Sequence, residues 1–271
     1  MARDEIERRL TAFGEATDDS FPLFDAAVTC ALHEDAERDA GQAYGLLDEA
    51  VDRLGLRLET EPPEEALAGA LGADLSLGGD AITYDALRNA DLLSVCERRR
   101  GLPVALGVFY LAAARRTGLK LRGVDFPGHF MLRLETESGP IAIDVFTGGR
   151  VVMPSELTRR ALHVGLPPTA ADQLDDLMRP VSDRRVLIRL QNNILARARN
   201  SGNLKAAERA SLRWALLDPK DPRPWIDLAS AREAGGLLAG AIDALGRAEA
   251  LGSAPGYAVD RMRDRVQKRL N

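Results

Sequence analysis

The spacing of hydrophobic residues predicts that the first 60 positions of the chain are helical. Ile6, Leu10 and Phe13 are four and three residues apart, and the same spacing returns twice before Gly55. Apolar residues at these intervals line one face of a helix. Gly55 then predicts the end of the third helix, because glycine is common just after the last helical turn.

The middle of the chain changes from a helical pattern to an alternating one. A helix is expected over 104–117, with Pro103 in its first turn, where the missing N–H group has no effect. The period of apolar residues then falls from 3.6 to 2, which predicts strands over 121–124, 130–135 and 140–146. The last two strands form a hairpin, so this block reads as an α+β unit with a small antiparallel sheet.

The remainder of the chain is predicted to be a connector followed by helices. Residues 150–180 are polar, with Pro167-Pro168 followed by a short acidic run, and they read as a connector. Beyond it, Gly202-Asn203-Leu204 matches Gly236-Leu237-Leu238 at an offset of 34 residues, and Ala254-Pro255 reads as the end of the second copy. An offset of 34 is the period of tetratricopeptide repeats.

These patterns predict an α+β, mostly α, protein in two parts. Residues 1–180 form a helical N-terminal region and the α+β core, and residues 181–271 form the helical repeats. Repeats of this kind bury their apolar faces only against neighbours, so we expect the two visible copies to pack on the rest of the chain.

Composition narrows the functional classes. The 36 Lys and Arg residues against 41 Asp and Glu residues give a net charge of −5, which argues against direct nucleic-acid binding. The chain has neither a long apolar run nor the apolar core of a signal peptide, so we expect a cytoplasmic protein with no membrane contact. Cys30 and Cys96 form no disulfide framework, and Cys30 with His33 reads as a buried pair, so we expect no metal and no cofactor.

His129 and Asp144 form the constellation that could carry chemistry. His129 stands at the start of one predicted hairpin strand, and Asp144 stands 15 residues later on the other strand. In a hairpin of this length the two become neighbours, and an aspartate beside a histidine fixes its tautomer and raises its basicity. A cysteine protease or acyltransferase of this type carries its nucleophile at the start of a packed helix.

Three short motifs resemble one bacterial family. They are Glu-Arg-Arg-Arg-Gly-Leu-Pro at 97–103, Pro-Gly-His-Phe at 127–130 and Ile-Asp-Val-Phe-Thr-Gly-Gly at 143–149. The family combines a transglutaminase-like domain with C-terminal tetratricopeptide repeats and is described as a regulator of sirC expression. The resemblance spans about residues 10–255 and implies a papain-like core. The family motif also includes Asn89, Glu97 and Arg100, so the resemblance makes these three residues candidates for binding.

The chain departs from this family where the nucleophile should stand. That position falls on Pro103, and the next residues, Val104, Ala105 and Leu106, are equally inert. Members of the family often carry a serine where Ala105 stands. Cys96 lies seven residues before Pro103, and a loop could fold it back toward the histidine, or it could be a small buried hydrophobic residue.

Two functional hypotheses follow, with a third taken from the family. The first is a non-catalytic interaction protein that binds partner proteins or peptides, with His129 and Asp144 kept as a structural pair and Asn89, Glu97, Arg100 and Pro103 as candidate binding residues. The alternative is a cysteine-dependent hydrolase or acyltransferase that uses Cys96 with the same pair.

The third hypothesis, regulation of transcription, is expected to be indirect, because no DNA-recognition helix is visible. The run Arg98-Arg99-Arg100 could hold a carboxylate or phosphate, or it could be a solvated helix end. His163 reads as a residue at the edge of the solvent. The oligomeric state stays open.

Overall fold

The computed structural model describes residues 2–171, 173–252 and 257–270 and divides the chain into two compact units. Unit 1 combines Met1–Phe21, Thr29–Arg38 and Ile188–Asn271, whereas unit 2 combines Pro22–Val28 and Asp39–Leu187. The division expected from the sequence is linear, with one boundary at residue 180. In the structure the N-terminal helix instead shares a unit with the C-terminal helices. Ala254 and Pro255 lie outside the described residues.

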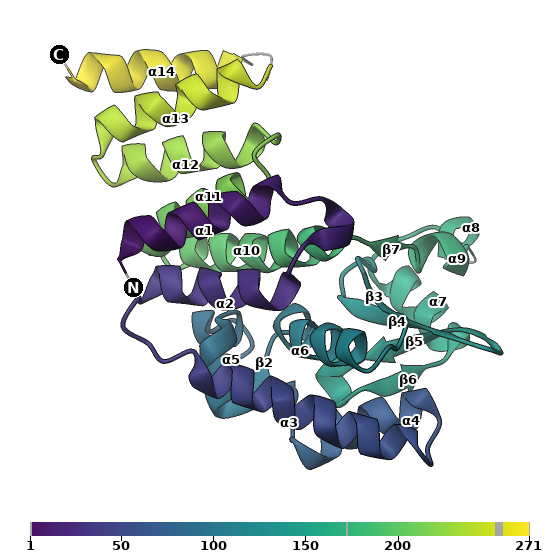
Figure 1. Cartoon of the computed structure of the whole chain (residues 1–271). Helices are drawn as coiled ribbons and strands as arrows, with labels where there is room; N and C mark the ends of the chain where they lie inside the picture. The colour runs from purple at the N-terminus through teal and green to yellow at the C-terminus, as the bar shows by residue number, and fades with distance from the viewer. Residues whose placement is uncertain (1, 172, 253–256, 271) are drawn as a thin grey trace. The chain divides into compact units, whose positions relative to one another are not determined.

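Unit 1 is helical. Two helices, α2 (Leu23–Glu34) and α10 (Asp183–Asn200), contribute residues to both units. The other elements of unit 1 are α1 (Arg3–Glu15), η1 (Asp18–Ser20), α11 (Leu204–Leu217), α12 (Arg223–Ala234), α13 (Leu238–Ala250) and α14 (Tyr257–Leu270). From α11 onward each helix packs on the next one along the chain (Figure 1).

Equivalent positions in the C-terminal helices are 34 residues apart. Helix α11 begins at Leu204 and α13 begins at Leu238. Each follows a glycine in the left-handed region, with φ of 68° at Gly202 and 76° at Gly236. Glycine adopts this conformation at little cost, so the same turn precedes both helices.

A buried arginine connects the helices of unit 1. The Arg213 side chain is only 2% exposed, and it pairs with Glu34 at 3.0 Å and donates to Gln191 Oε1 at 2.7 Å. Helix α1 packs on α11 so closely that a Cβ atom on Gly14 would lie 2.0 Å from the carbonyl oxygen of Leu216. N-terminal and C-terminal segments therefore share one interior.

Unit 2 holds the other helices and all of the strands. Its helical elements are α3 (Gly41–Leu58), α4 (Pro63–Leu67), the π-helical η2 (Ala68–Asp74), η3 (Leu87–Asn89), α5 (Leu92–Arg98), α6 (Pro103–Arg116), η4 (Val145–Thr147), α7 (Pro154–His163), α8 (Pro168–Ala171) and α9 (Leu174–Leu177). Its strands are β1 (Gly78–Gly79), β2 (Arg100–Gly101), β3 (Leu121–Val124), β4 (Met131–Thr136), β5 (Gly139–Asp144), β6 (Arg150–Val152) and β7 (Pro180–Val181).

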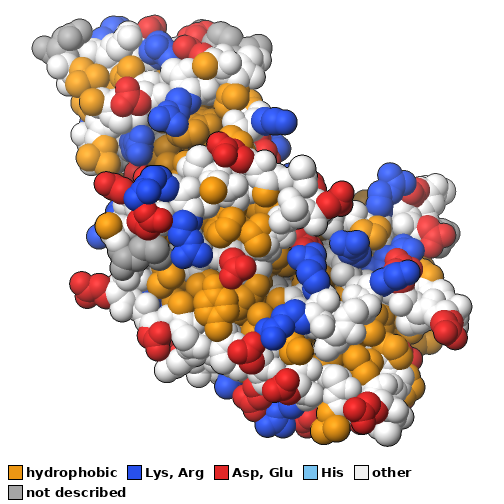
Figure 2. Space-filling model, in the orientation of Figure 1, with side chains coloured by type: hydrophobic (Ala, Val, Ile, Leu, Met, Phe, Trp, Pro, Cys, Tyr) orange, Lys and Arg blue, Asp and Glu red, His pale blue; other side chains and the backbone are white. Residues whose placement is uncertain are grey.

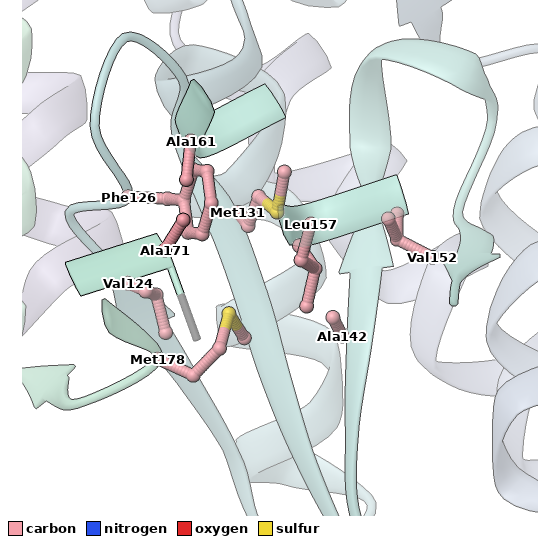
Figure 3. Close-up of a cluster of buried hydrophobic side chains, with 9 residues drawn as sticks. All are labelled: Val124, Phe126, Met131, Ala142, Val152, Leu157, Ala161, Ala171 and Met178. Atoms are coloured by element: carbon pink, nitrogen blue, oxygen red, sulfur yellow. The ribbon is translucent and has the colours of Figure 1, made fainter. Parts of the chain in front are cut away.

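Five of these strands form one antiparallel sheet in the order β6-β5-β4-β3-β7. Helix α6 contacts β3 and β4, and nearly all of its side chains are buried. Figure 3 shows the opposite face, where Val124, Met131 and Ala142 of the sheet meet Leu157 and Ala161 of α7. The sheet therefore lies between α6 and α7, because successive side chains of a strand point to opposite faces.

The predicted core elements agree with the structure, and two expectations fail. The helix at 104–117, the strand at 121–124 and the following hairpin are all present. The polar connector at 150–180 is wrong, since this stretch carries strands β6 and β7 and helices α7 to α9. Gly55 does not end α3, which continues to Leu58, because a glycine inside a helix destabilises it without necessarily breaking it.

Gly107 tests the contact between α6 and the sheet. A Cβ atom at this position would lie 2.5 Å from the Phe130 ring, which is buried. We expect Gly107→Ala to lower the free energy of unfolding by about 1–3 kcal/mol because the ring must move. Gly55→Ala is the matched control: nothing lies within 4 Å of its Cβ position, so it should raise stability by about 0.5–1 kcal/mol. Urea unfolding measures the free energy of unfolding of both variants. Equal changes in the two variants would contradict a close contact between position 107 and the Phe130 ring.

Candidate functional site

His129 and Asp144 meet at one end of the β4–β5 hairpin. Nε2 of His129 lies 3.1 Å from Oδ1 of Asp144, and the histidine side chain is 23% exposed whereas the aspartate side chain is 2% exposed. The backbone N–H of His129 donates to the Phe126 carbonyl oxygen at 3.0 Å, which closes the turn before β4. Gly128 holds this turn with φ of +72°. The sequence spacing and the local turn together bring the pair into contact.

Asp144 is saturated with hydrogen bonds. Its Oδ1 also accepts from the Phe146 N–H at 3.0 Å, and its Oδ2 accepts from Arg160 at 3.0 Å. Burial raises the pKa of the Asp144 carboxyl, but the hydrogen bonds and charges of His129 and Arg160 lower it by more, so the pKa lies below its usual value. An ionised carboxylate only accepts hydrogen bonds, so Nε2 of His129 carries the shared hydrogen.

A second carboxylate extends the network along α7. Glu156 accepts from Arg160 at 2.7 Å and from Arg150 at 2.8 Å. Hydrogen bonds from these two arginines lower the pKa of Glu156 to about 2. Two carboxylates and two arginines thus join β5, β6 and α7 beside the histidine.

The first turn of α6 offers no nucleophile. Pro103, Val104 and Ala105 are all buried, so this helix end presents neither a reactive group nor a polar surface. Cys96 lies on α5, which contacts α3 and α6, and its side chain is also buried. The structure therefore gives Pro103 a packing position at the start of a central helix.

Tyr110 is a buried polar group close to the pair. Its hydroxyl makes no hydrogen bond to the described residues, and it lies 3.1 Å from the place that a Cβ atom on Gly149 would occupy. Burial raises the pKa of Tyr110, and the negative charge of Asp144 raises it further. The phenol is therefore neutral and stays a weak donor in an apolar setting.

The arrangement can supply a base, but the first turn of α6 adds no nucleophile to it. With Nε2 of His129 directed to Asp144, Nδ1 is the remaining basic atom of the ring. Nucleophilic acyl transfer needs a thiol or hydroxyl within hydrogen-bond reach of that base. The first turn of α6 holds neither at Pro103, Val104 or Ala105.

Asn89 belongs to a separate buried cluster. Its side-chain amide donates to the Thr83 carbonyl oxygen at 2.6 Å, and its Oδ1 accepts from Arg98 at 2.9 Å. Arg98 also pairs with Asp80 at 2.7 Å, and the Asn89 carbonyl oxygen accepts from the Leu102 N–H at 2.8 Å. Asn89 thus fixes the loop before α5 to the turn before α6.

The two other candidate binding residues lie near this cluster. Arg100 stands on the short strand β2, opposite Gly78 of β1, and donates to the Ser76 carbonyl oxygen at 2.6 Å. Glu97 is exposed on α5. The structure therefore places Asn89, Arg100 and Pro103 in local packing and hydrogen bonding.

A cavity of about 330 Å³ opens beside His129. It lies between the turn before β4 and helix α7, and its lining includes Arg159, Arg160, His163 and Val164. His163 is exposed on α7, as expected for a residue at the edge of the solvent, and it also borders this cavity. The turn fits α7 tightly, since a Cβ atom on Gly128 would lie 2.6 Å from Val164.

Arg160, Glu156 and Arg159 were not predicted as site residues, because residues 150–180 were expected to form a connector. The available signal was Leu157 and Ala161, four residues apart after Pro154, with Glu156 and Arg160 at the same spacing. That pattern indicates an amphipathic helix with an ion pair along one side.

The described residues contain neither a metal-binding cluster nor a membrane-spanning helix. Among residues 2–171, 173–252 and 257–270, no three His, Cys, Asp or Glu side chains are placed to hold a metal ion. No helix in the same residues has the length and apolar character to cross a membrane. Cys30 and His33 are both buried in unit 1, where His33 Nε2 lies 3.1 Å from Glu7.

The lowered pKa of Asp144 predicts a specific dependence of stability on pH. Its contribution is fully present above the ordinary carboxyl pKa near 4 and is lost as the pH falls toward the lower folded-state value. We expect Asp144→Asn to reduce the free energy of unfolding by about 3 kcal/mol at neutral pH. The difference in free energy of unfolding between the wild type and Asp144→Asn should become smaller as the pH is lowered below about 4.

Denaturant unfolding of both proteins over a series of pH values measures this difference. Asp52→Asn, which removes an exposed carboxylate from α3, is the control and should change stability by less than about 0.5 kcal/mol. A deficit that stays constant down to low pH would show that the charge of Asp144 is not what stabilises the fold.

Comparison with known proteins supports a transglutaminase-like core. Residues 42–192 match the family model described as the transglutaminase-like superfamily. A UPF0162 protein of Xylella fastidiosa (strain Temecula1) is 32% identical over 235 residues, which cover 85% of this chain and 84% of the relative. A UPF0162 protein of Pseudomonas aeruginosa is 28% identical and covers 73% and 72% of the two chains.

An animal protein shows similarity over a shorter stretch of the chain. F-box only protein 21 of Mus musculus is 30% identical over 146 residues, 51% of this chain and 22% of that protein. No solved structure matches the chain. The family model covers more than half of the chain, and one relative matches it over most of both lengths, so the chain belongs to the transglutaminase-like superfamily and to the UPF0162 family.

Proposed function

We propose that this protein is a non-catalytic interaction protein that binds partner proteins or peptides through its transglutaminase-like core. The observation that carries the proposal is the first turn of α6, where Pro103, Val104 and Ala105 are buried and chemically inert. The His129–Asp144 pair then has a structural task, because it joins β5 to the turn before β4. Asp144 also anchors α7 through Arg160.

We also propose that the C-terminal helices are tetratricopeptide repeats. Support comes from the 34-residue offset between α11 and α13, from the left-handed glycines before both helices, and from Ala207 and Ala241, which are buried at the same offset. Repeats of this class present helical surfaces that hold extended or helical peptides. They would give the protein a second surface for partners.

The resembled family is described as a regulator of sirC expression. We propose that this protein would exert any such role through a protein partner. On the face shown in Figure 2, Lys and Arg side chains are interspersed with Asp and Glu side chains. A surface that binds DNA directly instead concentrates positive charge. The charge pattern of this face and the net charge of −5 favour an indirect role.

The alternative is a cysteine-dependent hydrolase or acyltransferase that uses Cys96 with His129 and Asp144. The geometry of the histidine–aspartate pair favours it, since Nε2 is held by the carboxylate and Nδ1 remains available as a base. The burial of Cys96 opposes it, because a nucleophilic thiol must reach its substrate.

Thiol reactivity separates the two proposals. Both cysteines are buried, and burial raises the pKa of Cys30 to about 12, so neither thiol should react readily in the folded protein. We expect iodoacetamide to modify Cys96 and Cys30 at similar rates, each more than about tenfold slower than in the urea-unfolded chain. Mass spectrometry of the peptides that contain each cysteine gives both rates, and Cys30 serves as the internal control.

Rapid modification of Cys96 alone, slowed by His129→Ala, would establish an activated thiol and overturn the non-catalytic proposal. A His129→Ala variant that leaves both rates unchanged agrees with it. The variant also needs an unfolding curve, so that a change in rate is not caused by a change in stability.

Selection from a random peptide library on the full chain tests partner binding. We expect selected peptides to bind reversibly with micromolar dissociation constants, and to bind Cys96→Ala as tightly as the wild type, because no thiol takes part. Fluorescence anisotropy gives the affinities, and mass spectrometry shows whether each peptide stays intact. The proposal is wrong if no peptide binds, or if bound peptides are cleaved or attached covalently and Cys96→Ala abolishes that reaction.

A further inference from the structure

The cavity beside His129 carries more positive charge than its neighbours neutralise. Arg159, Arg160, His129 and His163 all line it, and they come from both of its walls. Two carboxylates lie close by, Asp144 on β5 and Glu156 on α7. This concentration of cationic side chains stands out in a chain whose net charge is −5.

Most of these charges are already paired, and one is not. Arg160 is held by Asp144 and Glu156, and Arg150 is held by Glu156. Arg159, which also lines the cavity, makes no hydrogen bond or ion pair with the described residues. Its guanidinium group therefore borders the cavity without a partner among residues 2–171, 173–252 and 257–270.

One imidazole ring adds a donor to that of Arg159, and a second ring borders the site. His163 likewise makes no hydrogen bond with the part of the chain that the structure describes. His129 donates from Nε2 to Asp144, so Nδ1 of the neutral ring only accepts, and this ring borders the site without donating to an anion. Arginine and histidine N–H groups recognise oxygen anions, and arginine does so with two parallel hydrogen bonds.

The charge balance indicates which anion fits. Asp144 and Glu156 offset the guanidinium groups of Arg150 and Arg160, to which they are paired, whereas Arg159 lines the cavity outside these ion pairs. One positive charge remains, and it matches a singly charged carboxylate better than a doubly charged phosphate. The remaining lining includes Pro127 and Val164, which provide an apolar wall for a short carbon chain.

The size of the cavity limits the ligand. A volume of about 330 Å³ is at the small end of ligand sites in proteins. It accommodates a carboxylate with one or two small side chains and excludes a large cofactor. A peptide terminus and a small carboxylic acid both satisfy this limit.

We propose that the cavity between the turn at Pro127–His129 and helix α7 is a carboxylate-binding site, with Arg159 as its anchoring cation and His163 as an additional donor. The ligand is the C-terminal carboxylate of a peptide. The source of the carboxylate rests on the proposed peptide-binding role, whereas the site itself rests only on the lining of the cavity.

The three histidines of the chain allow a direct test by NMR of the imidazole rings. Acetyl-dialanine with a free carboxylate should shift the ring signals of His129 and His163 in a saturable manner. It should leave His33 unchanged, because His33 is buried in unit 1. The same peptide with a C-terminal amide should shift none of them, since the charged group is absent.

Matched variants identify the anchoring charge. Arg159→Gln should weaken the binding of acetyl-dialanine by about tenfold or more, because it removes a charge-assisted hydrogen-bond donor. Arg122→Gln removes the same charge from an exposed position on β3, outside the cavity lining, and should leave the affinity unchanged. Equal weakening by both variants would mean that only the overall charge matters and would overturn the proposal.

Other ligand results test whether the site exists, which class of anion it binds and which molecule supplies the carboxylate. If neither acetyl-dialanine nor butyrate shifts the rings, or if the amide acts like the acid, there is no carboxylate site. If inorganic phosphate binds and carboxylates do not, the anion class is wrong. If butyrate binds and acetyl-dialanine does not, the site is supported and its ligand is a small acid, which contradicts the peptide source.

Discussion

The Asp144 carboxylate receives His129 on one oxygen and Arg160 on the other, and this shared charge fixes the geometry around it. The three side chains come from β5, the turn before β4 and α7, so one buried group aligns three elements. Burial of an ion is costly unless both oxygens are satisfied. Here the backbone N–H of Phe146 adds a further donor, and the carboxylate remains ionised.

This arrangement gives the His129–Asp144 pair a structural contact in a core whose helix α6 begins with inert side chains. In a cysteine enzyme the aspartate orients the histidine for the thiol. In this chain the same contact joins the turn before β4 to the end of β5, and the start of α6 is filled by Pro103 and its apolar neighbours. The pair therefore joins two elements of the fold whether or not it takes part in a reaction.

Local patterns made α6 and the hairpin predictable, because each keeps a clear period over several residues and ends at a glycine or proline. Helix α7 was missed, since only Leu157 and Ala161 mark its buried side among polar residues. The His129–Asp144 contact follows from hairpin spacing, whereas the bond from Arg160 to Asp144 depends on how α7 packs on the sheet. The shared interior of α1 and α11 depends on contacts between distant segments and has no local signal.

The close approach of Gly14 to the Leu216 carbonyl has a consequence for synthesis on the ribosome. Helix α1 leaves the ribosome early, but α11 begins at Leu204, so its partner is made about 190 residues later. At about 5–20 residues per second, the N-terminal segment waits roughly 10–40 seconds for the surface that buries it. During that interval the side of α1 that carries Ile6 and Leu10 lacks its α11 partner, and unit 2, which ends at Leu187, is completed only shortly before α11 is made.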